Sequence, residues 1–259
     1  MTQADGSDQA MVLADGGIPL PLALRLETGA VEIEAQSCDV PSGACRVWLL
    51  PLAADDKISD ALLPLLADDE RAKANAYRAP SARRRFVQVR GALRLLLGRC
   101  LHVSAASISF DYGEFGKPML AQGGAWHFNV AHSGGYALLA VANGPEVGVD
   151  IEQHRDLPDL EDLARTVLSP SEAVAWHGLP MDERVPGFFA AWAGKEAVAK
   201  ATGQGLGLGL ERLDVGVGNW NTQSSPRLVR DGASAACQLF MLPAPAGYAA
   251  ALAARAAPG

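Results

Sequence analysis

The sequence predicts an α+β protein made of two similar halves that meet near residue 145, with a cleft between them. The main observation is an internal repeat: GYALLAVA at 135–142 returns as GYAAALAA at 247–254, 112 residues later. Each copy follows a stretch with helical spacing, a glycine-bearing turn and a strand-like segment, so both halves mix the two periodicities. Because alanine-rich stretches resemble one another easily, chance similarity is the alternative explanation.

The first 44 residues are expected to form an N-terminal extension that is partly disordered. Residues 1–16 are rich in Gly, Asp, Ser and Gln, a composition that buries little apolar surface. IPLPLALRL and AVEIEA are compatible with short strands, and SCDVPSGAC is typical of a loop. The compact fold is expected to start at CRVWLLPL (45–52), the first strand, followed by a helical stretch around LPLLADDERAKANAY. We therefore assign 45–145 to the N-terminal half and 146–259 to the C-terminal half.

A helix over about 81–99 is expected to supply much of the core of the first half. Apolar residues recur at spacings of three and four, which places them on one buried face: Phe86, Val89, Leu93, Leu97 and Leu101. Four arginines lie largely off this face: Arg83, Arg84, Arg90 and Arg94. The segment ISFDYGEFGKPML, with its turn glycines, and the strands WHFNVAHS and YALLAVA complete this half.

The second half is expected to open on the strand EVGVDIEQ. Ser169, Pro170 and Glu172 then have the spacing of a capping box with proline at the first helical position. WAGKEAVAK (192–200) predicts another helix, which the glycines of GQGLGLGL end before further strands. Gly194 costs up to about 1 kcal/mol against alanine inside a helix, so we expect this helix to begin there.

Composition and charge restrict the class of protein. The formal net charge is −7 and the pI is near 5.2, which argues against nucleic-acid binding through bulk positive charge. Four cysteines without CxxC spacing indicate reduced thiols. The N-terminus lacks the basic region of a signal peptide, and no apolar run approaches the roughly 18–20 residues that span a bilayer. We expect a cytoplasmic protein without nucleic-acid or membrane partners.

The segment EVGVDIE places two carboxylates on one face of a strand. Because side chains alternate along a strand, the apolar Val147, Val149 and Ile151 face a core while Asp150 and Glu152 share the opposite face. Their Cα atoms would lie roughly 6.5–7 Å apart. Two neighbouring carboxylates repel each other unless a cation intervenes, and Mg²⁺ is a natural partner for oxygen ligands and phosphate. The alternative is a half-exposed strand with an acidic outer face.

The stretch WAGKEAVAK carries a third carboxylate. Glu196 and Lys200 lie about 40° apart around a helix, whereas Lys195 is rotated by about 100° from Glu196. Glu196 could complete a metal site with the two strand carboxylates, and the lysines could neutralise phosphate. The alternative is an ordinary surface helix with an ion pair four residues apart, worth about 0.2–0.5 kcal/mol.

Three further motifs could contact phosphate. His132 is followed by Ser-Gly-Gly, which could present an imidazole and backbone N–H groups to an anion. Lys117 and Pro118 form a rigid turn that carries an exposed cation, and Arg83–Arg85 form a basic cluster at a helix start. Each motif also has a purely structural explanation. His132 could have a structural role, the Gly-Lys-Pro segment could be a plain turn, and the arginine cluster could be a solvated helix face.

Taken together and in this order, RRRFVQVRGALRLLLG, GEFGKPML, FNVAHSGG, VGVDIE and WAGKEAVAKATGQGL resemble the Sfp-type 4′-phosphopantetheinyl transferases. The resemblance covers about residues 45–255. It implies a pseudo-dimer of two α+β halves, the 4′-phosphopantetheinyl transferase fold, with the active site in the cleft between them. The chain departs from the family pattern at Ala131, where many members have Ser, and at Ala193, where Ser or Thr is frequent.

The resemblance also implies a role for each matched residue. The metal ligands are Asp150, Glu152 and Glu196, and the catalytic residues are Glu196, as the base, and Lys195, which assists proton transfer. The residues implied to contact coenzyme A are Lys73, Arg85, Lys117, Pro118, His132, Asp150, Lys195 and Lys200.

The activity that the resemblance implies is transfer of the 4′-phosphopantetheine arm of coenzyme A to a serine of an apo acyl or peptidyl carrier protein, with release of adenosine 3′,5′-bisphosphate. Mg²⁺, or Mn²⁺ in its place, is implied as the cofactor, and a monomer with internal pseudo-twofold symmetry as the working form. LPDLEDLARTVL is expected to help to dock the carrier, and a plain amphipathic helix is the alternative explanation of this segment. The alternatives are another Mg²⁺-dependent phosphoryl enzyme and a non-catalytic module that binds coenzyme A or a carrier protein.

Overall fold

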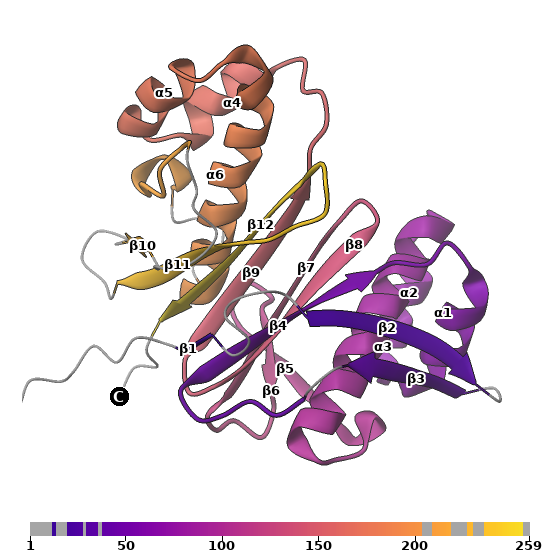
Figure 1. Cartoon of the computed structure of the whole chain (residues 1–259). Coiled ribbons are helices and arrows are strands. Elements are labelled where there is room, and N and C mark those ends of the chain that lie inside the picture. Colours follow the sequence, from indigo (N-terminus) through magenta and orange to yellow (C-terminus); the bar gives the residue numbers. More distant parts are fainter. Residues whose placement is uncertain are drawn as a thin grey trace, which may run out of the picture.

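Two sheets and two long helices organise the computed structural model, which describes residues 12–13, 20–27, 30–35, 38–203, 209–218, 227–229 and 236–255 (Figure 1). One sheet runs in the order β3-β2-β4-β8-β7, with β1 beside β4, and the other in the order β10-β11-β12-β9. A short hairpin, β5-β6, lies apart from both. The fold is therefore α+β, as the sequence predicts.

The elements follow the predicted order, and their bounds are these. In the N-terminal part they are β1 (Val12–Leu13), β2 (Leu20–Glu27), β3 (Ala30–Ala35), β4 (Ala44–Pro51), α1 (Asp56–Leu62), η2 (Leu63–Leu65), α2 (Asp68–Ala76), α3 (Pro80–Leu101), η3 (Ala105–Ser107), β5 (Phe110–Tyr112), β6 (Pro118–Leu120), β7 (Trp126–Ser133) and β8 (Tyr136–Asn143). In the C-terminal part they are β9 (Glu146–Gln153), α4 (Leu160–Val167), α5 (Pro170–His177), α6 (Met181–Thr202), η5 (Leu210–Arg212), β10 (Arg227–Val229), β11 (Cys237–Leu242) and β12 (Tyr248–Arg255).

The two copies of the sequence repeat occupy equivalent places in the two sheets. β8 pairs antiparallel with both β4 and β7, and β12 pairs antiparallel with both β9 and β11. Tyr136 lies opposite Pro51 at the end of β4, and Tyr248 lies opposite Gln153 at the end of β9. The two tyrosine rings meet edge to face, 5.1 Å between centroids. Each copy is therefore the central strand of a three-strand group with the same order, β4-β8-β7 in one sheet and β9-β12-β11 in the other.

Strands β8 and β12 are apolar throughout because both of their faces are buried. Along β8, one set of residues packs against α3 and the alternate set packs against the second sheet. Along β12, one set packs against α6 and the other joins the same shared core. The core between the sheets contains Leu138, Ala140 and Ala142 of β8 and Ala250, Leu252 and Ala254 of β12. Burial on both faces explains why these strands show no polar alternation.

Helix α6 lies close against β9 because β9 has a glycine at the crossing (Figure 1). A Cβ added at Gly148 would come within 3.0 Å of the Ala197 carbonyl oxygen and the Ala201 nitrogen, both backbone atoms of α6. Only a residue without a side chain allows such an approach. The contact places the last two turns of α6 directly over the carboxylate face of β9.

Two expectations about the helices are wrong in detail. Helix α6 begins at Met181 rather than at Gly194, because Gly194 lies in mid-helix against the side chains of Leu239 and Val215, and this packing outweighs its low propensity. Phe86 packs in a separate cluster under α1 and α2, away from the rest of its stripe. Arg90 and Arg94, which lie off the apolar face, are buried, and both pair with the buried Glu70 of α2.

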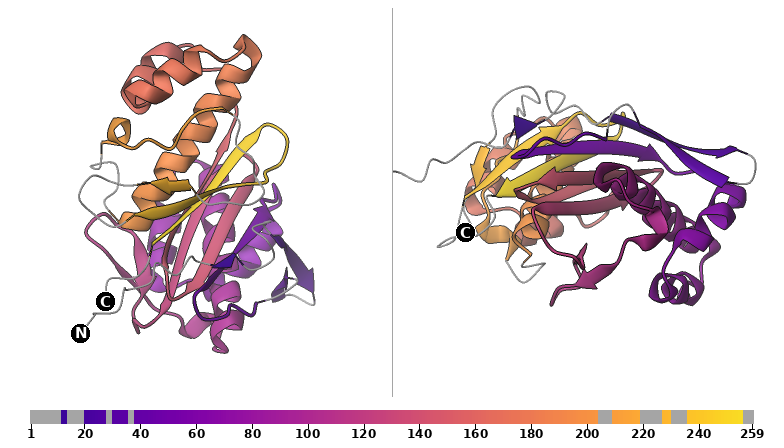
Figure 2. Two further views of the ribbon diagram at one scale, coloured as in Figure 1. Left: turned by 60° about the vertical axis from the view of Figure 1, so that its left-hand side comes forward. Right: turned by 90° about the horizontal axis from the view of Figure 1, so that it is seen from below.

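The N-terminal 44 residues contain more structure than expected. Within the segment expected to be disordered, residues 12–13 form β1 alongside β4, and 1–11 and 14–16 lie outside the described residues. β2 and β3 form the predicted strands and extend the first sheet beyond β4 (Figure 2). No helix in the described part of the chain is long and apolar enough to cross a membrane.

Candidate active site

The candidate site begins at Asp150, which is buried where α6 crosses β9. The apolar residues of β9 face the core between the sheets, and Asp150 faces α6, as the alternation predicts. Its Oδ1 accepts a hydrogen bond from Lys200 Nζ at 2.6 Å, and this amine also donates to the Val149 carbonyl oxygen at 3.3 Å. Burial raises the pKa of Asp150, and the Lys200 charge opposes the rise. Its second oxygen, Oδ2, is buried and has no hydrogen-bond partner.

Glu152 shares this face of β9 and is held by a residue of β7. Ser133 Oγ donates to Glu152 Oε2 at 3.0 Å and accepts from the Gln153 N–H at 3.1 Å. Burial raises the pKa of Glu152, and the charge of Asp150 raises it further. Side chains therefore join β7 to β9. A second such link is Asn129 Oδ1, which accepts from the buried Val149 N–H at 2.9 Å.

Glu196 is the third carboxylate of the cluster. Burial raises its pKa, and Lys200 lowers it while Asp150 raises it, so the charges of both residues act on Glu196. Lys200 pairs with Asp150 and not with Glu196, so the ordinary ion pair along the helix is not the interaction that forms. The structure thus brings together Asp150, Glu152, Glu196 and Lys200 around the crossing of β9 and α6.

A group of basic side chains borders this cluster. His132 is partly exposed at the end of β7, and the burial of the rest of its ring, together with the charges of Arg85 and Lys200, lowers its pKa and favours the neutral imidazole. Arg85 comes from the first turns of α3, so residues far apart in the sequence converge here. Lys73 of α2 has its amine 5.5 Å from the centre of the ring of Phe86, the residue after Arg85. This arrangement suits an anion with several charges.

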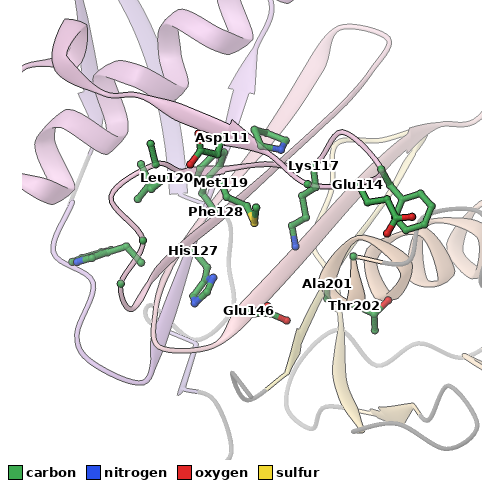
Figure 3. Close-up of a pocket in the computed structure, with 18 residues that line it drawn as sticks. Asp111, Glu114, Lys117, Met119, Leu120, His127, Phe128, Glu146, Ala201 and Thr202 are labelled. Atoms are coloured by element: carbon green, nitrogen blue, oxygen red, sulfur yellow. The ribbon is translucent and has the colours of Figure 1, made fainter. Parts of the chain in front are cut away.

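Lys117 is not the exposed cation that its turn predicts. Its Nζ donates to the carbonyl oxygens of Lys200, at 2.6 Å, and Val147, at 3.2 Å, and burial lowers its pKa. The amine therefore joins the GKP turn to the C-terminal end of α6. Lys117 and Pro118 also border a cavity of about 440 Å³ between the β5-β6 hairpin, the start of β7 and the end of α6 (Figure 3). This cavity contains none of the three carboxylates.

Lys195 does not belong to the carboxylate cluster, so a direct catalytic role for it is not supported. Its side chain is fully buried, and Nζ lies 2.6 Å from Glu172 Oε2. The amine also donates to the carbonyl oxygens of Leu210 and Leu213. The rotation of about 100° that separates it from Glu196 turns it into the core of the second half.

A divalent ion suits this donor set. Three carboxylates are available as hard oxygen ligands, and the unpartnered Oδ2 of Asp150 is a buried acceptor that a cation would satisfy. Among the described residues, no three His, Cys, Asp or Glu side chains form a ready-made metal site. In this arrangement the Lys200 ammonium supplies the positive charge beside Asp150.

Sequence reasoning missed Ser133 and Glu172. Ser133 positions Glu152 from a neighbouring strand. The one sequence feature that could have indicated this role is its place directly after His132. Glu172 was assigned only to the capping box, which the structure confirms: the Ser169 hydroxyl accepts from the Glu172 N–H, and Glu172 accepts from the Ser169 N–H. Its other oxygen accepts from the Val215 and Gly216 N–H groups.

Comparison with known proteins identifies the family of the chain. Residues 146–253 match the family model of the 4′-phosphopantetheinyl transferase superfamily, and the match begins at the first residue of β9. The chain is 38% identical over 178 residues to the 4′-phosphopantetheinyl transferase HetI of Nostoc sp., covering 67% of this chain and 74% of that protein. It is 33% identical over 206 residues to a putative 4′-phosphopantetheinyl transferase of Synechocystis sp., covering 73% and 82%. It is 31% identical over 162 residues to Sfp of Bacillus subtilis, covering 58% and 71%.

Half-buried carboxylates around the buried Asp150, with basic side chains beside them, have the chemistry of a site that suits a phosphate-bearing substrate. The chain belongs to the 4′-phosphopantetheinyl transferase superfamily, and it is an enzyme of that class.

Proposed function

We propose that this enzyme transfers the 4′-phosphopantetheine arm of coenzyme A to a serine hydroxyl of an apo acyl or peptidyl carrier protein, with Mg²⁺ or Mn²⁺ as cofactor. The second product is adenosine 3′,5′-bisphosphate. The observation that carries the proposal is the buried Asp150, whose Oδ2 has no partner, beside Glu152 and Glu196 and within reach of the Lys200 ammonium. Family membership supports the same activity.

Asp150, Glu152 and Glu196 are the proposed metal ligands. A divalent ion held there would act as a Lewis acid toward the pyrophosphate of coenzyme A. Ser133 fixes Glu152 for this role, because its hydroxyl binds the carboxylate on one side and the β9 backbone on the other. The close approach of α6 at Gly148 brings Glu196 to the same place.

The remaining charged residues are proposed to hold the nucleotide. Lys200 is placed to bind oxygens of the pyrophosphate, since its amine already reaches an anionic oxygen at 2.6 Å. His132 and Arg85 are close enough for Arg85 to lower the pKa of His132, and we assign both to the 3′-phosphate, with Lys73 as an outer contact. Lys117 and Pro118 keep their proposed place near the adenine, through the backbone and the ring rather than the amine.

Glu196 is the proposed general base. Burial raises its pKa, which makes the carboxylate a better proton acceptor than an ordinary glutamate. It would take the proton of the carrier serine as the serine Oγ forms a bond to the β-phosphorus. The bond from that phosphorus to the bridging oxygen breaks, and adenosine 3′,5′-bisphosphate leaves with the bridging oxygen. α4 lies beyond β9 and next to α6, so the segment 153–168 is placed to contribute to carrier docking.

The test is mass spectrometry of apo carrier proteins incubated with coenzyme A, with and without Mg²⁺. A gain equal to the phosphopantetheine arm is expected only with the metal, and Glu196→Gln should remove it. Glu183→Gln, in the exposed first turn of the same helix, is the matched control and should keep full transfer. If neither acyl nor peptidyl carriers gain mass while coenzyme A is hydrolysed, the enzyme is a hydrolase and the proposal fails.

A further inference from the structure

Two cysteines outside the active site come together at the C-terminal end of α3. Cys38 lies in the segment that leads into β4, and Cys100 lies in the last turn of α3. Both pack in the same core cluster of the first half, with Trp48 and Leu97, and the two thiols interact as side-chain partners. We propose that Cys38 and Cys100 are a redox modification site, at which a peroxide converts the two thiols into a reversible disulfide.

The two thiols differ in exposure, which suits them to different parts in such a reaction. Cys38 is partly exposed, whereas Cys100 is buried beneath it. A peroxide can therefore reach the Cys38 sulfur first, and Cys100 is already in contact with it as the second thiol. Cys45 and Cys237 are also buried, but each lies in a different core cluster. They lie outside the core cluster that holds Cys38 and Cys100, so they are internal controls for buried thiols elsewhere in the fold.

The surroundings of Cys38 also favour its reactive form. Contact with the Cys100 thiol and the charges of Arg99 and Arg46 lower the pKa of Cys38 to about 7, although partial burial opposes the change. A substantial fraction is therefore thiolate at neutral pH, and the thiolate is the nucleophile. Contact with Cys38 and burial raise the pKa of Cys100, so Cys100 keeps its proton in the reduced pair.

The proposed reaction is balanced with one molecule of hydrogen peroxide. The Cys38 thiolate attacks a peroxide oxygen, the O–O bond breaks, and Cys38 becomes a sulfenic acid while hydroxide leaves and takes a proton to form water. Cys100 then attacks the Cys38 sulfur, its thiol proton passes to the departing hydroxyl, and a second water leaves. The sulfurs are oxidised by two electrons in total, and a dithiol reductant reverses the change.

The disulfide would connect the segment ahead of β4 to the end of α3. Arg85, the residue of this helix assigned to the nucleotide, lies about four turns away from Cys100. We therefore expect oxidation to stabilise the fold rather than to block the active site. Closing a long loop should raise the thermal midpoint on the order of 5 °C, and reduction should restore the lower value.

The experiment treats the reduced full-length protein with hydrogen peroxide, alkylates the remaining thiols after unfolding, and maps peptides without reduction. A Cys38–Cys100 cross-linked peptide that disappears on reduction is expected, with Cys45 and Cys237 alkylated as before. Cys100→Ser should instead accumulate a sulfenic acid on Cys38, which dimedone labels, and Cys38→Ser should leave Cys100 reduced.

A second measurement uses the unmodified native protein, in case a variant does not fold. Brief alkylation at neutral pH should label Cys38 before the other three cysteines. Recovery of four alkylated cysteines after peroxide, a cross-link that involves Cys45 or Cys237, or over-oxidation of Cys38 without a link to Cys100 would each overturn the proposal.

Discussion

Lys195 Nζ and Glu172 Oε2 lie 2.6 Å apart, with at most 1% of either side chain exposed to solvent. The pair joins the first turn of α5 to the middle of α6, and its remaining hydrogen bonds reach the segment from Leu210 to Gly216. A buried ion pair whose hydrogen bonds are this complete is a structural connection. It fixes the helix on which Glu196, the next residue, stands.

The first prediction separates this positioning role from proton transfer by Lys195. Lys195→Met leaves Glu172 as a buried carboxylate without its counter-charge, which should cost about 3–5 kcal/mol of unfolding free energy in urea. Lys195→Met combined with Glu172→Gln removes both charges and should recover more than half of that loss. Transfer activity should return with stability, and the pH profile of kcat should match that of the wild type.

Either of two results would contradict the positioning role of Lys195. If the double variant is as stable as the wild type but inactive, or if it loses one limb of the pH profile, then Lys195 takes part in proton transfer and the positioning role is wrong.

The second prediction concerns Gly148. Gly148→Ala should push α6 away from β9, because the new Cβ meets the α6 backbone, which cannot yield as a flexible side chain would. We expect a loss of about 1–3 kcal/mol in stability, together with a larger loss of transfer as Glu196 and Lys200 move from Asp150. Gly113→Ala is the control, since its nearest neighbour would lie 3.7 Å away. Equal effects of the two substitutions would contradict the argument.

The third prediction is that the stability of the folded protein depends on pH because Glu152 ionises. Burial and the charge of Asp150 raise the folded-state pKa of Glu152, so between its unfolded and folded pKa the folded chain binds more protons. The free energy of unfolding therefore falls as the pH rises through that window. At pH 8, where Glu152 is ionised in both states, the whole of this loss is present. Without added metal, Glu152→Gln should raise the thermal midpoint on the order of 2 °C at pH 8.

This gain should shrink as the pH falls below the ordinary pKa of glutamate, where Glu152 is protonated in both states. Glu183→Gln on the exposed start of α6 should change the midpoint little at either pH. A gain that grows toward acid pH would show that the sign is wrong.

Much of the site could be predicted from local sequence. The alternation of EVGVDIE placed Asp150 and Glu152 on one face, and helical spacing placed Glu196 and Lys200 together, because both depend only on backbone geometry. The repeat indicated two halves, and the strand order of β4-β8-β7 and β9-β12-β11 has the same form.

What the sequence could not show depends on distant partners. The buried place of Lys195 follows from Glu172 on another helix, and the mid-helix place of Gly194 follows from Leu239 and Val215. Likewise, Lys117 was expected to be exposed, because nothing in GEFGKPML shows that the end of α6 will present it with the Lys200 carbonyl. Periodicity shows that the two faces of a helix or strand differ in polarity. Only the tertiary packing determines which residues each face contacts.

The last prediction concerns competition between Lys200 and the metal. The Lys200 ammonium lies 2.6 Å from Asp150 Oδ1, at one of the proposed ligands. Lys200→Met should remove this positive charge, so the free enzyme should bind Mn²⁺ roughly tenfold more tightly in a calorimetric titration. The same variant should transfer phosphopantetheine about 10- to 100-fold more slowly, because it loses a charged hydrogen bond to the pyrophosphate. Lys200→Arg should keep Mn²⁺ affinity near that of the wild type. Weaker Mn²⁺ binding by Lys200→Met would show that Lys200 supports the metal site instead of competing with the ion.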